Sequence, residues 1–418
     1  MPPDVRAVLA ISADRRDAAQ QKKIADYFRT RAPELLAAKL QLDTSNKERA
    51  AVEGSIASVM VMKETPQPRE AHILKRGEYD KPGDKVERGL PAALPPLPPG
   101  APLNRLGLAQ WLVSGEHPLT ARVWVNRAWE RFFGTGLVKT SENFGSQAEW
   151  PSHPELLDWL ATEFVRLKWD MKAMQKTIVM SATYRQSSRV TAAQIERDPE
   201  NRLLARGPRM RLGAEALRDQ ALAVSGLLVE KVGGPSVRPY MPAGVWDETS
   251  VYGDMRGYKA DPGDGLYRRT LYTIWKRTAA PPTMQLFDSP TREICTVKRS
   301  RTNTPLQALA LLNEVTYVEA ARRLAERMLT EGGATPGERL AWGFRRVTCR
   351  TPDAEELKVL AAGVEKRLTR FRQSADAAKQ LVAFGEAKPA AGLDPAEVAA
   401  YATAANVMLN LDEAVTRE

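Results

Sequence analysis

The chain has 418 residues, which exceeds one typical domain and allows a sizeable hydrophobic core to be buried. Its hydrophobic fraction of 43% and charged fraction of 27% are typical of a globular protein and exclude a disordered one. No stretch approaches the apolar length of a membrane span. The net charge of +10, from 61 basic and 51 acidic residues, favours an anionic partner such as a phosphate, a sulfate, a carboxylate or an acidic protein surface.

The N-terminal part of the chain predicts helices followed by an extended segment. Residues 14–57 predict a helical hairpin, which defines an N-terminal region of residues 1–58. Residues 59–103 are rich in proline and glycine, so we expect an extended linker packed on the surface. The runs Val59–Met62 and His72–Leu74 are candidates for a minor strand pair. The start of the chain has no basic stretch followed by an apolar run, so no signal peptide is recognisable.

Residues 104–418 predict one main helical domain. Apolar residues recur at helical spacing through most of residues 104–205, again from Gly213 to Val229, and from residue 304 to the end. An irregular insertion over residues 233–303, rich in glycine, proline and tyrosine, interrupts them. The expected fold class is therefore mainly α: a multi-helix globular domain with long irregular Pro/Gly-rich insertions and at most a minor β element.

The stretch "EWPSHPELLDWLATEF", residues 149–164, places a serine, a histidine and two carboxylates within seven residues, as a hydrolase site would. We interpret it instead as a helix start, with Ser152 at the N-cap and Glu155 at the N3 position of a capping box. A cap followed by proline recurs at Thr304, Thr335, Thr351 and Asp394. A spacing that recurs at several helix starts indicates structure rather than a catalytic triad.

Several kinds of active site are not supported by the sequence. It contains no GxSxG, HExxH or P-loop motif, and its three histidines are widely scattered. Neither Cys295 nor Cys349 lies in a CxxC or CxxCH motif, so we expect buried free thiols, no metal site and no cofactor in this chain. Five loop acids do not match the EF-hand spacing, and a solvated acidic loop is expected there: Asp247, Glu248, Asp254, Asp261 and Asp264.

The most informative polar segment is residues 266–303, in which basic and aromatic residues alternate. Such residues suit an anionic or glycan ligand, through paired hydrogen bonds and stacking. The candidate ligand-binding residues are Arg268, Arg269, Trp275, Lys276, Arg277, Arg292, Arg301 and Asn303, and the candidate catalytic carboxylates are Asp288 and Glu293. The alternative is a buried ion-pair network that ties the irregular segment to the helices, and both interpretations stay open.

Two further groups of polar residues stand out in the sequence. Asn126 and Arg127 lie on a mostly apolar helix, where we expect them to be satisfied internally by a neighbouring loop. A second set of arginines predicts a solvated or phosphate-attracting face, since no nucleic-acid-binding module accompanies them: Arg202, Arg206, Arg209, Arg211 and Arg218.

Six motifs carry a family resemblance. They are "NRLGLAQWLVSGEHPLTARVWVNRAWERFFGTGLVKTSENFG", "PSHPELLDWLATEF", "SATYRQSS", "LYRRTLYTIWKRT", "RTNTPLQALALLNE" and "LNLDEAVTRE". Together they resemble the planctomycete-specific domain-of-unknown-function family, the C-terminal module of large planctomycete cytochrome c-like multidomain proteins. The resemblance implies no established activity. It implies haem only in members that carry the cytochrome segment, and periplasmic or exported localisation if the chain derives from such a larger protein.

These observations lead to two main hypotheses. The first is a binding or scaffold module of an exported cytochrome-associated protein that recognises an anionic ligand or partner, with a cytochrome c-like domain or protein as one partner. The second is an enzyme acting on complex carbohydrate, sulfated or not, with Asp288 or Glu293 as acid or base. We expect no nucleic-acid partner and no membrane span.

Overall fold

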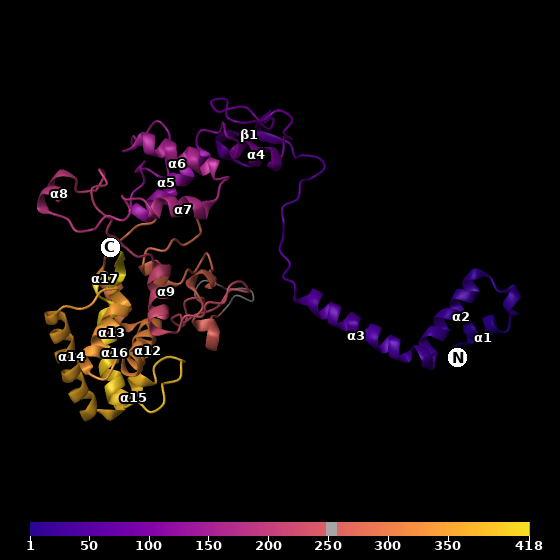
Figure 1. The fold of residues 1–418 in the computed structure, drawn as a ribbon. Helices are drawn as coiled ribbons and strands as arrows, with labels where there is room; N and C mark the ends of the chain where they lie inside the picture. Colours follow the sequence, from indigo (N-terminus) through magenta and orange to yellow (C-terminus); the bar gives the residue numbers. More distant parts are fainter. Residues whose placement is uncertain (248–256, 418) are drawn as a thin grey trace. The chain divides into compact units, whose positions relative to one another are not determined.

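The computed structural model describes residues 1–247 and 257–417 (Figure 1). The part of the chain described contains seventeen α-helices and two antiparallel sheets of two strands each, which confirms the predicted mainly α fold. None of these helices combines the length and the apolar character needed to cross a membrane. The chain divides into two units, residues 1–89 and residues 90–418.

The first unit has very little core. It consists of α1 (Pro3–Leu9), α2 (Ala18–Arg31), α3 (Pro33–Ser55) and a hairpin of β1 (Ala71–Leu74) and β2 (Pro82–Val86). Helices α2 and α3 contain no buried residue, and Val5 and Ala32 are the buried hydrophobic residues found in this unit. The helices therefore depend on local features, such as the capping box between Asp17 and Gln20 at the start of α2.

The prediction of a strand at Val59–Met62 was wrong. These four residues are exposed and lie outside any strand. The segment His72–Leu74 does form a strand, but it pairs with β2 through Ala71↔Val86 and His72↔Lys85. The backbone N–H and C=O groups of a strand need a partner strand for their hydrogen bonds. For His72–Leu74 that partner is the nearby β2.

The second unit begins with a helical core built around α5. Its helices are α4 (Arg105–Leu112), α5 (Thr120–Phe133), α6 (Pro154–Arg166), α7 (Met171–Val179) and α8 (Ala192–Arg197). Val125, Trp129 and Phe133 of α5 are buried with Leu160 and Phe164 of α6. The Trp124 ring stacks on the Phe164 ring at a centroid distance of 4.0 Å, so aromatic packing joins α5 to α6.

A second, larger core is built from the remaining helices. These are α9 (Ala214–Ser225), α10 (Pro282–Leu286), α11 (Pro305–Asn313), α12 (Val315–Glu331), α13 (Pro336–Thr348), α14 (Ala354–Gln373), α15 (Ala375–Val382), α16 (Pro395–Leu409) and α17 (Asp412–Val415). Helix α16 packs against α12, α14 and α15 (Figure 1). Its buried alanines, among them Ala399, Ala400 and Ala405, let the neighbouring helices approach closely. A short sheet of β3 (Met210–Arg211) and β4 (Thr416–Arg417) completes this region.

The predicted helix starts are largely confirmed. Thr335 forms a full capping box with Glu338, and Asp353 rather than Thr351 forms one at the start of α14. Thr304 and Asp394 act as N-caps, each followed by proline at the first helical position.

The capping box predicted at Ser152 was wrong. Helix α6 begins at Pro154, and its N-cap is His153, whose side chain makes no capping hydrogen bond. Both the backbone N–H and the hydroxyl of Ser152 donate to the carbonyl oxygen of Leu137, which ties the serine to the loop after α5. Asp158 pairs with Arg122 instead of facing His153, so no triad forms here either.

The two cysteines are free, as expected, but both are exposed rather than buried. Cys349 ends α13 in a left-handed conformation, with φ at +63°, at the surface. Cys295 lies in the irregular segment that follows α10. Neither position belongs to the apolar face of a helix, which is the feature that would have buried it.

Asn126 bridges α5 to the loop that follows it, which confirms the expectation of internal satisfaction. Its side chain is fully buried and donates to the carbonyl oxygen of Val138 at 3.0 Å and to Ser141 Oγ at 3.1 Å. Its Oδ1 accepts from the backbone N–H of Val138 at 2.8 Å. Arg127, the next residue, is exposed, so the expectation was wrong for it.

Replacing Asn126 by alanine should destabilise the protein, because the buried N–H and C=O groups of Val138 lose their partner. We expect the free energy of unfolding to fall by about 2–6 kcal/mol, because each of the two unsatisfied groups costs about 1–3 kcal/mol. Urea denaturation followed by tryptophan fluorescence measures this. Arg127→Ala is the matched control and should change stability by about 0.5 kcal/mol or less. Equal loss in the two variants would contradict the bridging role of Asn126.

Candidate functional site

Arg268, the first candidate ligand-binding residue, makes its hydrogen bonds to other parts of the protein. Its side chain is 5% exposed and donates to the carbonyl oxygens of Lys231 at 2.9 Å, Gly233 at 2.5 Å and Pro235 at 3.1 Å. Its guanidinium also lies 3.8 Å from the centroid of the Tyr272 ring. The structure therefore places Arg268 as a tie for the loop at residues 231–235.

A second pair of candidates forms a stacked unit at the surface. The Arg292 guanidinium lies 4.2 Å from the centroid of the Trp275 ring, and Trp275 Nε1 donates to the carbonyl oxygen of Thr291 at 2.8 Å. Glu293 follows directly and is exposed. Its backbone N–H donates to Thr291 Oγ1 at 3.4 Å.

The remaining surface candidates do not converge on one site. Arg269 Nε lies 3.8 Å from Asp219 Oδ2, and Lys276 Nζ lies 5.2 Å from the centroid of the Trp246 ring. Arg277 and Asn303 are exposed.

A cavity of about 760 Å³ lies elsewhere in the larger unit. Helix α5 and the turn after it form one side, and β3 with the start of α9 forms another. Segment 287–307 and Arg417 complete the wall. Among the candidate ligand-binding and catalytic residues, the cavity brings together Arg301 and Asp288, and Arg211 of the predicted phosphate-attracting face also lines it.

The lining of this cavity is strongly basic. Two carboxylates, Glu130 and Asp288, face seven basic side chains: Arg127, Arg131, Arg211, Lys298, Arg299, Arg301 and Arg417. Six of the seven are guanidinium groups, which offer several N–H donors in a planar fork suited to oxyanions. The cavity is thus the place where much of the chain's surplus of positive charge is gathered.

Helix α5 presents its polar face to the cavity. Arg127 and Arg131 are four residues apart, so they lie on one face of the helix, and both are exposed. The opposite face carries the buried Val125, Trp129 and Phe133. Burying that apolar face therefore directs the two arginines outward into the cavity.

Segment 287–307 supplies three more basic side chains to the cavity, Lys298, Arg299 and Arg301. Two of them contact α5 or the turn that ends it. Arg301 donates to the carbonyl oxygen of Gly134 at 3.0 Å, and Lys298 Nζ lies 3.7 Å from Glu130 Oε1. Gly134 ends α5 with φ at +82°, and a Cβ at this position would lie 3.1 Å from Arg301 Nη1. Glycine therefore suits the left-handed turn, and its lack of a Cβ leaves room for Arg301.

The cations influence one another. Partial removal from water lowers the pKa of the Arg301 guanidinium below its ordinary value, and the charges of Arg131 and Arg417 lower it further. Glu130 partly offsets this effect by favouring the charged form. An anion placed among these three arginines would relieve their repulsion.

Asp288 has a structural task in the wall. It adopts a left-handed conformation, with φ at +62°, and its carboxylate accepts from the backbone N–H of Thr302 at 2.7 Å and from Thr302 Oγ1 at 3.0 Å. Gln307 Nε2 donates to the same hydroxyl at 3.0 Å. Asp288 therefore holds the two ends of segment 287–307 together.

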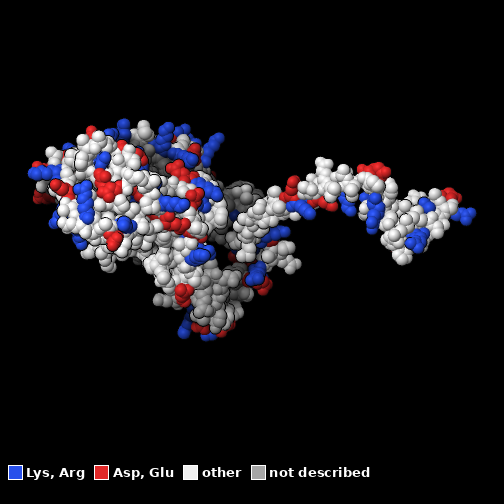
Figure 2. Space-filling view, turned by 90° about the horizontal axis from the view of Figure 1, so that it is seen from below, with Lys and Arg blue, Asp and Glu red and all other residues white. Residues whose placement is uncertain are grey.

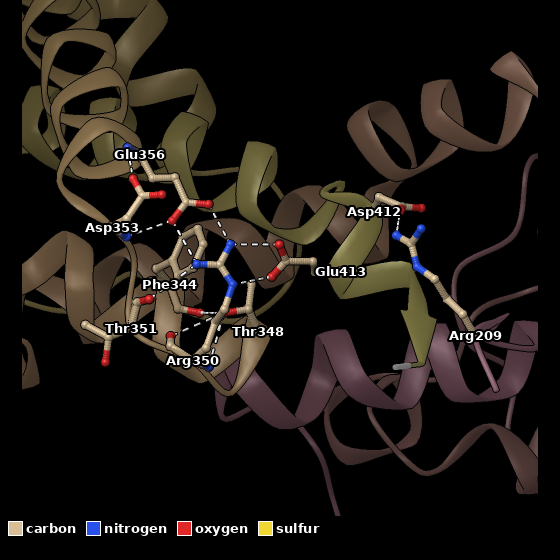
Figure 3. A network of polar contacts seen from close by, with 9 residues as sticks. All are labelled: Arg209, Phe344, Thr348, Arg350, Thr351, Asp353, Glu356, Asp412 and Glu413. Atoms are coloured by element: carbon tan, nitrogen blue, oxygen red, sulfur yellow. Dashed lines mark hydrogen bonds and ion pairs between the residues drawn. The ribbon is translucent and has the colours of Figure 1, made fainter. Parts of the chain in front are cut away.

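Arg417, which lines the cavity, follows a network of ion pairs that we call the C-terminal clasp. Figure 3 shows the clasp, which consists of Arg209, Arg350, Glu356, Asp412 and Glu413. The Arg417 guanidinium donates to the carbonyl oxygen of Phe132 at 2.7 Å and lies 5.1 Å from the centroid of the Tyr184 ring. The residues before it are anchored by two ion pairs: Asp412 contacts Arg209, and both oxygens of Glu413 accept from Arg350 at 2.7 Å.

Arg350 is the centre of this clasp. Besides Glu413 it binds Glu356, with donor–acceptor distances of 2.8 and 2.5 Å, and its guanidinium lies 4.8 Å from the centroid of the Phe344 ring (Figure 3). Hydrogen bonds from Arg350 and from the backbone N–H of Asp353 lower the pKa of Glu356 to about 2. One arginine thus joins α13, α14 and α17.

Sequence reasoning found the cavity only in part. Arg301 was a candidate, whereas Arg127 was assigned to internal bonding and Arg131 and Arg417 were not singled out. The available signal was the pair of arginines four residues apart on α5, next to a buried apolar face. No local pattern connects Arg131 with Arg417.

Metal binding has no support in the described residues. They contain no group of three His, Cys, Asp or Glu side chains placed to hold an ion. Of the loop acids, Glu248 and Asp254 lie outside the described residues. Asp261 Oδ2 accepts from the backbone N–H of Arg238 at 2.8 Å, so this carboxylate shapes its own loop.

Removing the Glu356 carboxylate should flatten the acid part of the stability profile. The folded pKa of about 2 lies below the ordinary value of 4.5, so the stabilisation is complete above pH 4.5 and is lost as the pH falls towards 2. We expect the melting temperature of Glu356→Gln to fall less between pH 5 and pH 2.5 than that of the wild type. Glu355→Gln, on the same turn of α14 but outside the clasp, should keep the wild-type profile. A wild-type profile for Glu356→Gln would contradict this assignment.

Comparison with known proteins identifies the family. The family described as "PSD1: Protein of unknown function (DUF1553)" matches residues 104–364, which is more than half of the chain and includes α5 and segment 287–307. No curated protein and no solved structure is similar enough to the chain to count as a match. The chain belongs to this family of proteins of unknown function.

Proposed function

We propose that this chain is a binding module that holds an anionic ligand, or an acidic part of a partner, in the cavity between α5 and segment 287–307. The observation that carries the proposal is the excess of basic over acidic side chains around one cavity, seven against two. Arg299 is paired with Glu215 and Lys298 lies near Glu130, and the other five cations are all arginines. Like charges that are gathered and partly withdrawn from water repel one another, and a bound anion offsets that cost.

Geometry favours a ligand larger than a single small ion. The volume of about 760 Å³ falls in the range of typical ligand sites, roughly 300–1,000 Å³. The lining also includes apolar side chains such as Met210, Leu212 and Val297. A ligand with two or more oxyanions on a partly apolar framework would use both kinds of surface.

The family resemblance suggests a setting for this module. The resemblance drawn from the sequence motifs implies relatives with a cytochrome c-like segment, which would hold the haem. We therefore propose that the module works in an exported, planctomycete-type protein and that a cytochrome c-like domain or protein is among its partners. The acidic ligand would then belong to the same assembly or to its substrate.

An enzyme that acts on complex carbohydrate, sulfated or not, remains the alternative. It is favoured by the presence of Asp288 and Glu130 in the same cavity as the arginines. Against it, the carboxylate of Asp288 already accepts from Thr302 and that of Glu130 pairs with Lys298. Glu293 does not line the cavity. A binding role needs none of these carboxylates to be free.

A nucleic-acid partner is less well supported. On the face shown in Figure 2, Lys and Arg side chains of the larger unit are mixed with Asp and Glu side chains. A nucleic-acid surface typically groups its basic residues in a stripe or patch.

Binding of inorganic tripolyphosphate to the whole chain tests the proposal. We expect saturable binding by calorimetry, weakened by added salt because the contacts are ionic. Arg131→Gln and Arg301→Gln should each weaken it about tenfold, as expected for the loss of one charged contact. Arg277→Gln is the matched control, an exposed arginine outside the cavity, and should bind like the wild type. Binding that is equally weakened by Arg277→Gln, or absent altogether, would overturn the anion site.

A further inference from the structure

Strand β3 and the two residues that follow it border the cavity. Four consecutive residues, Met210 to Gly213, line the cavity. In an extended chain, successive side chains point to opposite faces, so the side chains of Met210 and Leu212 share one face and that of Arg211 takes the other. Consecutive residues can all border one cavity when the edge of the strand, rather than one of its faces, is turned towards it.

This edge of β3 is unpaired. The sheet has two strands, with Met210 opposite Arg417 and Arg211 opposite Thr416. The backbone N–H of Leu212 donates to the carbonyl oxygen of Val415 at 2.9 Å. Bonded and non-bonded pairs alternate along an antiparallel ladder, so Met210 and Leu212 bond towards β4 while the N–H and C=O of Arg211 point away from it. Among the described residues, no backbone group outside the β3–β4 ladder bonds to these two groups of Arg211.

The surroundings of the edge are charged and apolar but offer no ring for stacking. Arg131 and Arg301 lie in the same cavity, together with the side chains of Met210 and Leu212. The aromatic residue of the lining is Phe287, which is only 3% exposed. Nucleobases and sugar rings are usually held by stacking on an exposed aromatic side chain. The cavity therefore suits an extended chain that carries carboxylates better than it suits a ring.

From these features we infer that the ligand is an extended acidic peptide segment of a partner protein, which adds a strand to the free edge of β3. This inference rests on the proposed anion-binding function and names its ligand class. The backbone of the segment exchanges hydrogen bonds with the N–H and C=O of Arg211. Its carboxylates meet Arg131, Arg301 and the neighbouring cations, and its apolar side chains contact Met210 and Leu212. Strand addition supplies affinity through the main chain, while charge selects an acidic sequence.

Backbone methylation tests the strand pairing directly. The probe is a fluorescein-labelled peptide of alternating glutamate and valine, ten residues long, titrated with the whole chain and followed by fluorescence anisotropy. Two isomers carry N-methyl groups on either the glutamate or the valine amides. A strand added at one edge uses only one of these two sets of N–H groups. We expect one isomer to bind like the parent peptide and the other to bind at least about tenfold more weakly, the effect of losing main-chain hydrogen bonds.

Controls separate the peptide from the anion site. A peptide with glutamine in place of glutamate should lose binding, and Arg131→Gln should weaken the parent peptide while Arg277→Gln does not. Strand addition is overturned if both methylated isomers bind like the parent, or if both lose binding equally. If tripolyphosphate binds in an Arg131-dependent way and the peptide does not, the anion site stands and the peptide inference fails. If neither probe binds, both proposals fail.

Discussion

Arginine side chains that donate to backbone carbonyl oxygens hold the irregular part of the larger unit in place. Arg218, on α9, is buried and donates to the carbonyl oxygens of Leu266 at 2.5 Å and Arg268 at 3.0 Å. Arg268 in turn holds the loop at residues 231–235. A guanidinium has five donors in a fixed plane, so one side chain satisfies several carbonyl groups that lack partners in helices or sheets. A segment with little regular structure can pack against helices because these groups are satisfied.

This use of arginine has an electrostatic consequence. A carbonyl oxygen is neutral, so an arginine bound to it keeps its full charge, whereas an arginine bound to a carboxylate is neutralised. Arg301 and Arg417 are tethered to the carbonyl oxygens of Gly134 and Phe132 at the end of α5. The same contacts that close the cavity therefore leave it positively charged. Arg301 therefore ties the irregular segment to α5 and keeps its charge, so this structural role is compatible with the anion binding proposed above.

The C-terminal clasp works by a different principle. There the charges are paired: Arg350 lies between Glu356 and Glu413, and Arg209 contacts Asp412. Two carboxylates on one guanidinium form a compact network at the partly exposed ends of α13, α14 and α17. This network of two arginines and three carboxylates anchors the segment that carries Arg417, so the position of one cavity cation depends on contacts made by residues outside the cavity. The paired charges of the clasp hold β4 in position. Arg417, at the end of β4, donates to a neutral carbonyl oxygen and brings its positive charge to the cavity.

The sequence by itself determined the mainly α fold and most helix starts, because caps and apolar periodicity act within a few residues of one another. It also determined the bridge made by Asn126, since a buried amide in an apolar helix must find partners nearby. It did not determine which polar residues share a site. The hydroxyl of Ser152 donates to the carbonyl oxygen of Leu137 instead of capping its own helix. Residues Val59–Met62 pair with no strand in the described part of the chain. The cavity joins Arg131, Arg301 and Arg417 from distant segments, and only the packing of the two helical cores brings these charges together.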